Sequence, residues 1–316
     1  MSPALFCSRV ASAPLAALFL LAASPARAQD SPTLERFTVR VDGHPMALWA
    51  RRPGVPKATI LLIHGRTWSS IPDFDLQVPG EPRSAMQALA ARGYAAYALD
   101  LRGYGATPRD GTGWLTPRRA ASDVAEVLRW VAQQQKGPEA PVLMGWSNGA
   151  LVSQLVAQRW PDRMSALVVL GYPLDPGDSI GTVDTPDKPQ RLPNTAEAAA
   201  SDFITPAVIT RRVRDAYVTA ALKADPINVD WRGVEEYNAL DPARVRVPTL
   251  LIQGEFDPAA PTPAQARFFA NLGTADRAWI TIPGGDHAAI LESTQPAVIA
   301  AVINFLERPK LPKGKR

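Results

Sequence analysis

The sequence predicts an α/β fold with a mostly parallel central sheet and helices on both faces. Strand-like and helix-like segments alternate along most of the chain, which is the pattern of a sheet built from strand-helix-strand units. The strand-like segments are continuously apolar, as is typical of strands that are buried on both faces. With 316 residues, 46% of them apolar and 20% charged, the chain is long enough to bury a large core.

Residues 1–28 have the features of a secretory signal peptide. Arg9 gives a positive beginning, residues 11–23 form a short apolar stretch, and residues 26–28 match an A-x-A cleavage pattern. The apolar stretch is too short to span a bilayer comfortably. We therefore expect cleavage after Ala28 and a periplasmic or secreted protein with no stable membrane insertion. An uncleaved membrane anchor is the alternative.

Loss of this segment changes the composition of the mature chain. It removes the only cysteine, Cys7, and leaves 32 basic and 30 acidic residues, a net charge of +2. The mature chain then has no thiol for catalysis, for a disulfide or for metal binding. A nearly neutral chain without a basic stripe argues against nucleic acid as a partner. Residues 309–316 form a short basic tail, which we expect to be a solvated end.

The elements of the first half follow from apolar spacing. A hairpin is expected first, because residues 37–41 and 44–51 flank an Asp-Gly turn. Continuous apolar runs then indicate strands, and apolar residues at helical spacing indicate helices. In chain order, we expect a strand at 58–63, a loop at 66–82, a helix at 83–92, a strand at 94–99, a helix at 117–135, a strand at 141–144, a helix at 150–160 and a strand at 166–170.

Regular alternation breaks at residues 173–245. This segment has eight prolines, 12 acidic and 8 basic residues, and helical spacing only near 196–202 and 206–224. The alternation then resumes with a strand at 248–253, a helix at 263–272, a strand at 278–282 and a helix at 295–306. The predicted organisation is a core of residues 29–172 and 246–308, interrupted by an insert of residues 173–245.

Polar side chains follow the predicted strands at the points where they end. They are His64, Asp100, Ser147, Asp257 and His287. The carboxyl ends of parallel strands meet at one edge of a sheet, where binding sites form in such folds. We therefore expect the functional site at this edge.

Residues 145–149 read Gly-Trp-Ser-Asn-Gly, a G-x-S-x-G motif between a predicted strand and a predicted helix. The two glycines permit the sharp turn that lifts a serine hydroxyl clear of the sheet, and this context indicates a nucleophile. The alternative is a glycine-rich structural turn. The motif makes Ser147 the candidate nucleophile.

A serine hydroxyl needs a base, and the mature chain has three histidines. His44 follows the hairpin turn, and we expect it at the surface. His64 ends a strand, and we expect it to pack beneath the following loop. His287 lies in a loop after the last strand and is the candidate base.

Asp257 is the candidate acid that orients the base, because it follows a strand and gives the chain order Ser, Asp, His. Glu255 and Asp286 are alternatives. For the oxyanion, the backbone N–H groups of Asn148 and Arg66 are the expected donors, since both follow strands next to the nucleophile.

Aromatic side chains near the strand ends are candidates for binding substrate. Trp68, Trp146 and Tyr172 are expected to shape the pocket, although Trp146 has an equally good alternative role packing between helix and sheet. No metal ligands are expected.

At these residues the chain resembles the α/β-hydrolase superfamily. The segments His64-Gly65, 100–105, 145–149, 254–257 and 285–287 occur in that family's order, and the resemblance covers roughly residues 35–308. It implies an α/β-hydrolase fold, a triad of Ser147, Asp257 and His287, and an insert that acts as a helical and loop cap. Among the capped members, the chain looks like a serine esterase.

Three differences from known patterns argue against particular groups within this superfamily. A serine in place of an aspartate nucleophile argues against haloalkane dehalogenases and epoxide hydrolases. The residues beside Ser147 differ from the pattern of proline iminopeptidases. The loop after residues 58–63 has no HGGG run, which argues against the hormone-sensitive lipase type.

We therefore expect an exported serine hydrolase that cleaves small-molecule carboxylic esters through an acyl-enzyme and needs no cofactor. An amide or lactone hydrolase, or an acyltransferase, with the same triad is the first alternative. A non-catalytic small-molecule-binding protein is the second. The sequence does not indicate an oligomeric state.

Overall fold

The computed structural model describes residues 32–134, 139–181 and 183–309. The signal peptide expected at 1–28 and all but the first residue of the tail expected at 309–316 lie outside the described residues. Within the described ranges, no helix is both long enough and apolar enough to cross a membrane.

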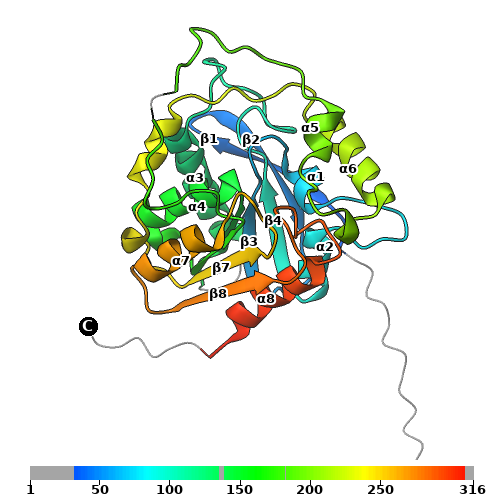
Figure 1. Cartoon of the computed structure of the whole chain (residues 1–316), viewed down its shortest axis with the longest axis vertical. Coiled ribbons are helices and arrows are strands. Elements are labelled where there is room, and N and C mark those ends of the chain that lie inside the picture. The colour runs from blue at the N-terminus through cyan, green and yellow to red at the C-terminus, as the bar shows by residue number, and fades with distance from the viewer. Residues whose placement is uncertain (1–31, 135–138, 182, 310–316) are drawn as a thin grey trace, which may run out of the picture. The chain divides into compact units, whose positions relative to one another are not determined.

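One eight-stranded sheet forms the centre of the fold (Figure 1). Its strands are β1 (Glu35–Val41), β2 (His44–Arg51), β3 (Ala58–Ile63), β4 (Tyr94–Leu99), β5 (Val142–Trp146), β6 (Ala166–Leu170), β7 (Thr249–Gly254) and β8 (Arg277–Ile282). Their order in space is β1-β2-β4-β3-β5-β6-β7-β8. The strands from β4 to β8 in this order pair in parallel, whereas β1 and β2 form an antiparallel hairpin whose second strand runs antiparallel to β4.

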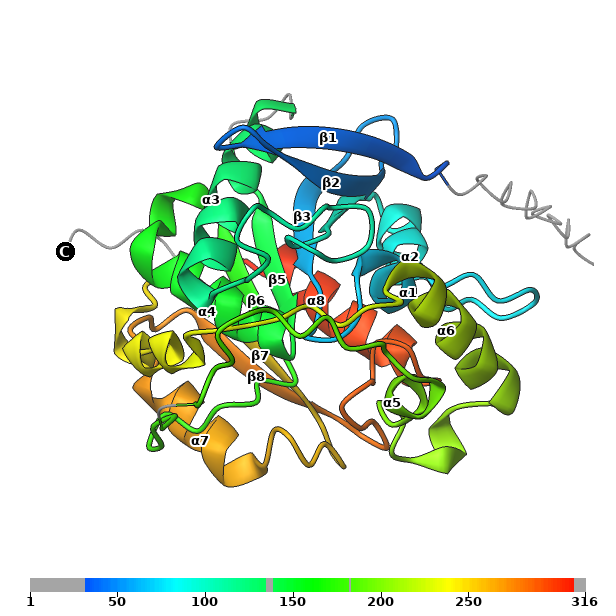
Figure 2. The ribbon, with the colours of Figure 1, turned by 90° about the horizontal axis from the view of Figure 1, so that it is seen from above.

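Helices cover both faces of this sheet (Figure 2). Those outside the insert are α1 (Ser70–Phe74), α2 (Ala85–Ala91), α3 (Pro117–Gln134), α4 (Asn148–Arg159), α7 (Thr262–Asn271) and α8 (Gln295–Glu307). Side chains of α3 and α4 belong to one buried apolar cluster, and those of α2 and α8 belong to another.

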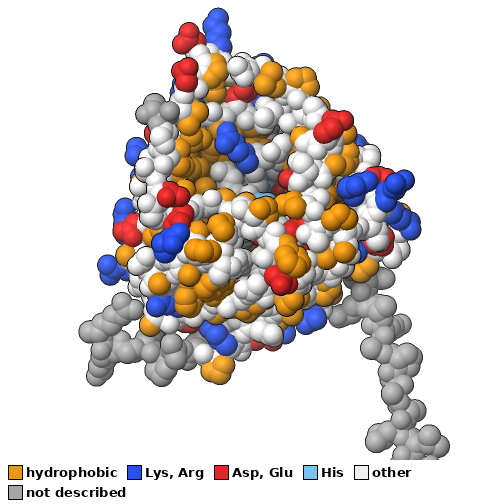
Figure 3. Space-filling model, viewed as in Figure 1, with side chains coloured by type: hydrophobic (Ala, Val, Ile, Leu, Met, Phe, Trp, Pro, Cys, Tyr) orange, Lys and Arg blue, Asp and Glu red, His pale blue; other side chains and the backbone are white. Residues whose placement is uncertain are grey.

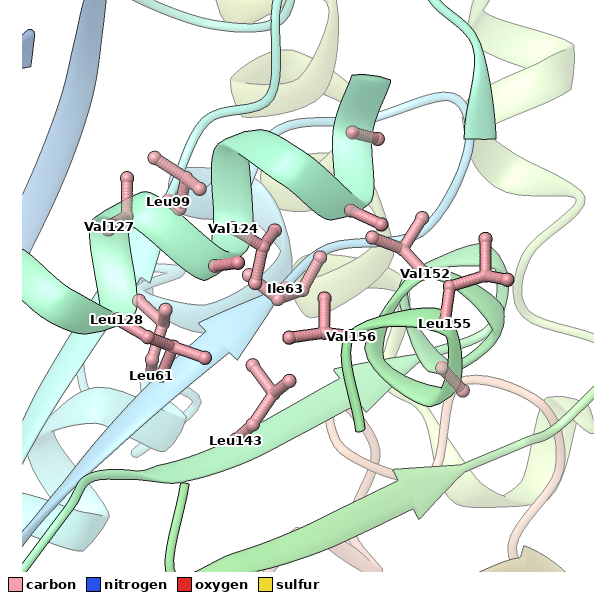
Figure 4. Packing of buried hydrophobic residues seen from close by; sticks show 14 of the residues in the cluster. Leu61, Ile63, Leu99, Val124, Val127, Leu128, Leu143, Val152, Leu155 and Val156 are labelled. Carbon is pink, nitrogen blue, oxygen red and sulfur yellow. The ribbon is translucent and has the colours of Figure 1, made fainter. Parts of the chain in front are cut away.

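Successive side chains of the central strands pack into opposite clusters. In β3, Leu61 and Ile63 pack in the cluster with α3 and α4, and Ile60 and Leu62 pack in the cluster with α2 and α8. Figure 4 shows Leu61 and Ile63 directed toward the apolar side chains of α3 and α4. Every residue of β4, β5, β6 and β7 is buried, which explains why these strands read as continuous apolar runs.

The structure has the predicted α/β architecture, with three local differences. A short helix, α1, lies within the segment expected to be a loop at 66–82. β5 continues two residues past the expected end, because Gly145 and Trp146 pair with β3 and β6. Residues 206–208 form a separate 3-10 turn, so that α6 begins only at Arg211.

The insert joins β6 to β7 and carries its own short helices. These are α5 (Ala196–Ala200), α6 (Arg211–Ala224) and the 3-10 helices η2 (Pro206–Val208), η3 (Val234–Ala239) and η4 (Pro242–Arg244). Helix α6 lies beside α1 in both ribbon views (Figures 1 and 2). The insert therefore packs on loops at the carboxyl edge of the sheet.

Candidate active site

Ser147 occupies the tight turn between β5 and α4. Its backbone has φ of 55° and ψ of −125°, a left-handed conformation that is uncommon for a residue with a side chain. A Cβ on Gly145 would lie 2.2 Å from the carbonyl oxygen of Gly149, and a Cβ on Gly149 would lie 2.2 Å from that of Ile63. Both glycines are therefore required for the helix to approach the strand this closely.

A chain of hydrogen bonds links Ser147 to two more predicted site residues. The Oγ of Ser147 lies 2.9 Å from Nε2 of His287. Nδ1 of His287 lies 2.9 and 3.0 Å from the two carboxylate oxygens of Asp257. Because a carboxylate only accepts, Nδ1 carries the proton and Nε2 is left to accept the proton of Ser147.

The loop that carries His287 is fixed from below. The indole Nε1 of Trp146 donates to the backbone carbonyl of His287 over 2.8 Å. Burial lowers the pKa of His287, but the hydrogen bond and charge of Asp257, with smaller effects of Asp202 and Asp286, raise the pKa above its ordinary value. The surroundings thus favour the imidazolium form.

The other two histidines make hydrogen bonds with the backbone and not with Ser147. His64 is fully buried, with Nδ1 2.8 Å from the carbonyl of Gly65 and Nε2 accepting the N–H of Leu101 over 3.1 Å. Burial lowers the pKa of His64 to about 4, so that it is neutral at neutral pH. His44 contacts the carbonyl of Pro108, far along the sheet from the serine.

The two alternative acids, Glu255 and Asp286, bind backbone N–H groups and not the ring of His287. The carboxylate of Glu255 accepts the N–H of Gly284 over 2.9 Å. The carboxylate of Asp286 accepts the backbone N–H groups of Ile204 and Thr205, which belong to the insert, and that of Ala288. Asp286 therefore connects the histidine loop to the insert, whereas Asp257 is the acid bound to His287.

Of the two predicted oxyanion donors, Asn148 directly follows Ser147, and Arg66 lines the pocket that contains it. Asn148 is the first residue of α4, and its N–H points out of the helix start. Gly65 and Arg66 line the same pocket as Ser147, and a Cβ on Gly65 would lie 3.6 Å from the Cβ of Ser147. The side-chain oxygen of Asn148 accepts a hydrogen bond from Tyr237 of the insert over 2.9 Å.

A small pocket of about 100 Å³ opens over Ser147 and His287. Trp68 and Trp146 line it, as expected, and Trp146 also packs against the ring of His287 with the ring centres 5.8 Å apart. Figure 3 shows that this face of the molecule is hollowed near its centre, with hydrophobic side chains along part of the wall.

The expectation that Tyr172 shapes the pocket is wrong. Its side chain is fully buried, and its ring packs at a tilt against Phe268 of α7 with the ring centres 4.4 Å apart. Its hydroxyl donates to Gln154 of α4. The chain turns at the end of β6 so that this residue points into the core.

Two acidic residues that the sequence did not single out line the pocket beside the serine. They are Asp73 of α1 and Asp202 of the insert. The hydroxyl of Tyr217 lies 3.0 Å from Asp73 and 3.2 Å from Asp202. The phenol O–H of Tyr217 thus lies between the two carboxyl groups.

Burial, with the nearby Asp202, raises the pKa of Asp73 well above its ordinary value. Burial raises the pKa of Asp202 to about 6, against the opposing effects of Tyr217 and His287. The surroundings therefore favour the protonated form of Asp73, and Asp202 becomes charged above about pH 6. The only sequence signal for Asp202 was the acidic excess of the insert, which did not identify a residue.

Comparison with known families shows the family to which the chain belongs. The sequence model of the family described as serine aminopeptidase, S33, matches residues 54–294, which is most of the chain. The protein belongs to this family. It is thus a hydrolase of the α/β-hydrolase fold, as the resemblance implied. A search of curated proteins gave no significant match.

Solved structures support the same fold for this S33 family member. A serine hydrolase of carbazole degradation shares 18% identity with a TM-score of 0.62, covering 87% of this chain and 99% of the other. A hydrolase from Pseudomonas aeruginosa shares 19% with a TM-score of 0.61, and a thermophilic esterase from Thermogutta terrifontis shares 18% with a TM-score of 0.60. Each of these two comparisons covers 87% of this chain and 98% of the other.

Proposed function

We propose that this S33 family member is an exported serine hydrolase that cleaves carboxylic esters with a short acyl group. The observation that carries the proposal is the unbroken hydrogen-bond chain from Ser147 through His287 to Asp257. The pocket of about 100 Å³ over the serine favours a small acyl group. The insert, which contributes Asp202 to this pocket, acts as its cap.

The proposed reaction has two steps with the same groups. Ser147 Oγ attacks the ester carbonyl while His287 Nε2 takes its proton, and Asp257 stabilises the resulting imidazolium. The N–H groups of Arg66 and Asn148 hold the oxyanion. His287 then protonates the leaving alcohol, and water repeats the sequence on the acyl-enzyme to release the acid.

The first test is hydrolysis of p-nitrophenyl esters from acetate to palmitate, with fluorophosphonate labelling. We expect labelling of Ser147 and the highest kcat/KM with acetate or butyrate. Ser147→Ala should lower kcat by on the order of 10⁴- to 10⁶-fold and abolish labelling.

Ser153→Ala is the matched control, since Ser153 is buried on α4, the helix that follows Ser147, and its Oγ has no hydrogen-bond partner among the described residues. It should retain wild-type activity. Labelling without ester turnover would redirect the search to amides, lactones or acyl transfer. A folded wild type that is not labelled would contradict the triad and favour a non-catalytic binding protein.

A second candidate is hydrolysis of amides or esters that carry a free amino group. The charged Asp202 faces the serine pocket, and no described Lys or Arg is paired with it, so it can bind an ammonium group. The family description, serine aminopeptidase, agrees with this candidate. The discriminating assay compares aminoacyl p-nitroanilides with p-nitrophenyl acetate. For this candidate, Asp202→Asn raises KM for the amino substrates and leaves that for acetate unchanged.

A further inference from the structure

A second and larger cavity lies under helix α6 of the insert. Its volume is about 420 Å³, which is within the range of small-molecule sites, against about 100 Å³ for the pocket at Ser147. Helix α6 forms one side of it through Ala220, Lys223 and Ala224. The other sides come from β2 and from the loops after β3 and β4.

This cavity is separate from the serine pocket. The two cavities share no lining residue, although residues of one segment, 65–77, contribute to both. Trp68 and Asp73 line the serine pocket, whereas Ser69 and Asp75 line the larger cavity. The segment that includes α1 thus divides the two spaces.

The interior wall of the cavity is mainly apolar. Trp49, Ile71, Leu76 and Ala220 supply apolar surface to it. An aliphatic chain that entered the cavity would lose its contact with water without leaving any of these groups unsatisfied.

The two carboxylates in the wall already have partners. Asp75 receives two hydrogen bonds from the buried Arg51, at 2.7 and 2.9 Å. Asp100 accepts the indole N–H of Trp49 and the backbone N–H groups of Ser70 and Ala106, at 2.9 to 3.0 Å. The hydrogen bonds of both acids are thus satisfied within the protein.

Lys223 is the charged group in the wall that has no such partner. It is exposed on the last turn of α6, and no ion pair among the described residues includes it. An unpaired ammonium at the edge of an apolar cavity suits a ligand with an aliphatic body and one anionic end. We propose that this cavity is a second ligand site, distinct from the site at Ser147, which binds an aliphatic carboxylate with its anion on Lys223.

The test is titration calorimetry with octanoate on wild type before and after fluorophosphonate treatment. We expect one molecule of octanoate to bind with the same affinity to both, because the site excludes Ser147. Octanol should bind more weakly than octanoate, since it lacks the charge that pairs with Lys223.

Two variants locate the site. Lys223→Ala should weaken octanoate binding by about five- to tenfold, and Ala220→Trp should abolish it by filling the cavity. Arg212→Ala is the matched control, because Arg212 is an exposed cation on the same helix that lines neither cavity. It should bind octanoate as wild type does. Circular dichroism and thermal unfolding check that Ala220→Trp is folded.

Binding that is lost on fluorophosphonate labelling would overturn the proposal and place octanoate at Ser147. Binding that Lys223→Ala leaves unchanged, or no measurable binding to wild type, would overturn it as well. If fluorophosphonate does not react at all, the ester proposal fails, whereas the effects of Lys223→Ala and Arg212→Ala still decide the second site.

Discussion

Asp202 is a residue of the insert that acts electrostatically on His287. It lines the pocket with Ser147 and is one of the charges that raise the pKa of His287. Its own pKa, about 6, means that it becomes charged in the range where histidines titrate. We therefore expect the acid side of the activity profile to reflect two interacting groups, His287 and Asp202.

At this scale we predict that Asp202→Asn shifts the acid side of the kcat/KM profile to lower pH, by roughly half a unit. The base must be neutral to act, and removing a nearby negative charge lowers the pKa of His287. The shift is measured from the pH dependence of kcat/KM with p-nitrophenyl acetate. The effect depends on the charge of wild-type Asp202, which is present above about pH 6.

Asp187→Asn is the control, since Asp187 is an exposed acid of the insert that lines neither cavity. Its profile should match wild type. An unchanged or alkaline-shifted profile for Asp202→Asn would contradict an electrostatic effect of Asp202 on His287.

Single residues were predictable where a short sequence motif marks them or where the chain has few residues of the required type. The G-x-S-x-G motif fixes the position of Ser147 within five residues, and only three histidines could serve as its base. Asp202 and Tyr217 were not predictable, because their contact with Asp73 joins residues about 130 to 145 positions apart. Tyr172 was mispredicted because its place after a strand does not decide which way its side chain points.

At the scale of elements, the turn from β5 to α4 depends on close backbone packing. We predict that Gly145→Ala destabilises the protein by about 3 kcal/mol or more and removes activity, since its Cβ would meet the backbone of Gly149 at 2.2 Å. Urea unfolding, with the ester assay, measures both effects.

Gly54→Ala is the matched change, because nothing lies within 4 Å of a Cβ there. It should alter the free energy of unfolding by less than about 1 kcal/mol. A Gly145→Ala protein as stable and active as Gly54→Ala would show that the turn can relax around the added methyl group.

Most element bounds could be read from apolar runs, because buried parallel strands leave little choice of side chain. Helix α1 was missed because it is a single turn in a segment rich in proline and aspartate. Pro72 lies in its first turn, where a proline removes no helical hydrogen bond. The short 3-10 turn at 206–208 likewise carries too few residues for a periodic pattern.

At the scale of the whole molecule, the prediction concerns export from the cytoplasm. We predict that the full chain, expressed in a bacterium with a periplasm, is recovered outside the cytoplasm with its N-terminus at Gln29. Fractionation and intact-mass measurement test this. Ala28→Arg should block cleavage, because the site requires a small residue, and a chain that begins at Gln29 without the leader should stay in the cytoplasm. Full-length protein recovered in the cytosol would contradict the prediction.

The insert enters and leaves the core at β6 and β7, which are neighbours in the sheet. It interrupts none of the strands that carry Ser147, Asp257 and His287. Its side chains nevertheless belong to both apolar clusters of the core, and Asp202 is one of the charges that act on His287. Exchange of residues 173–245 would therefore leave the reacting groups on their own strands while changing both the shape of the pocket and the charge beside the base, so that selectivity and pH dependence would evolve together.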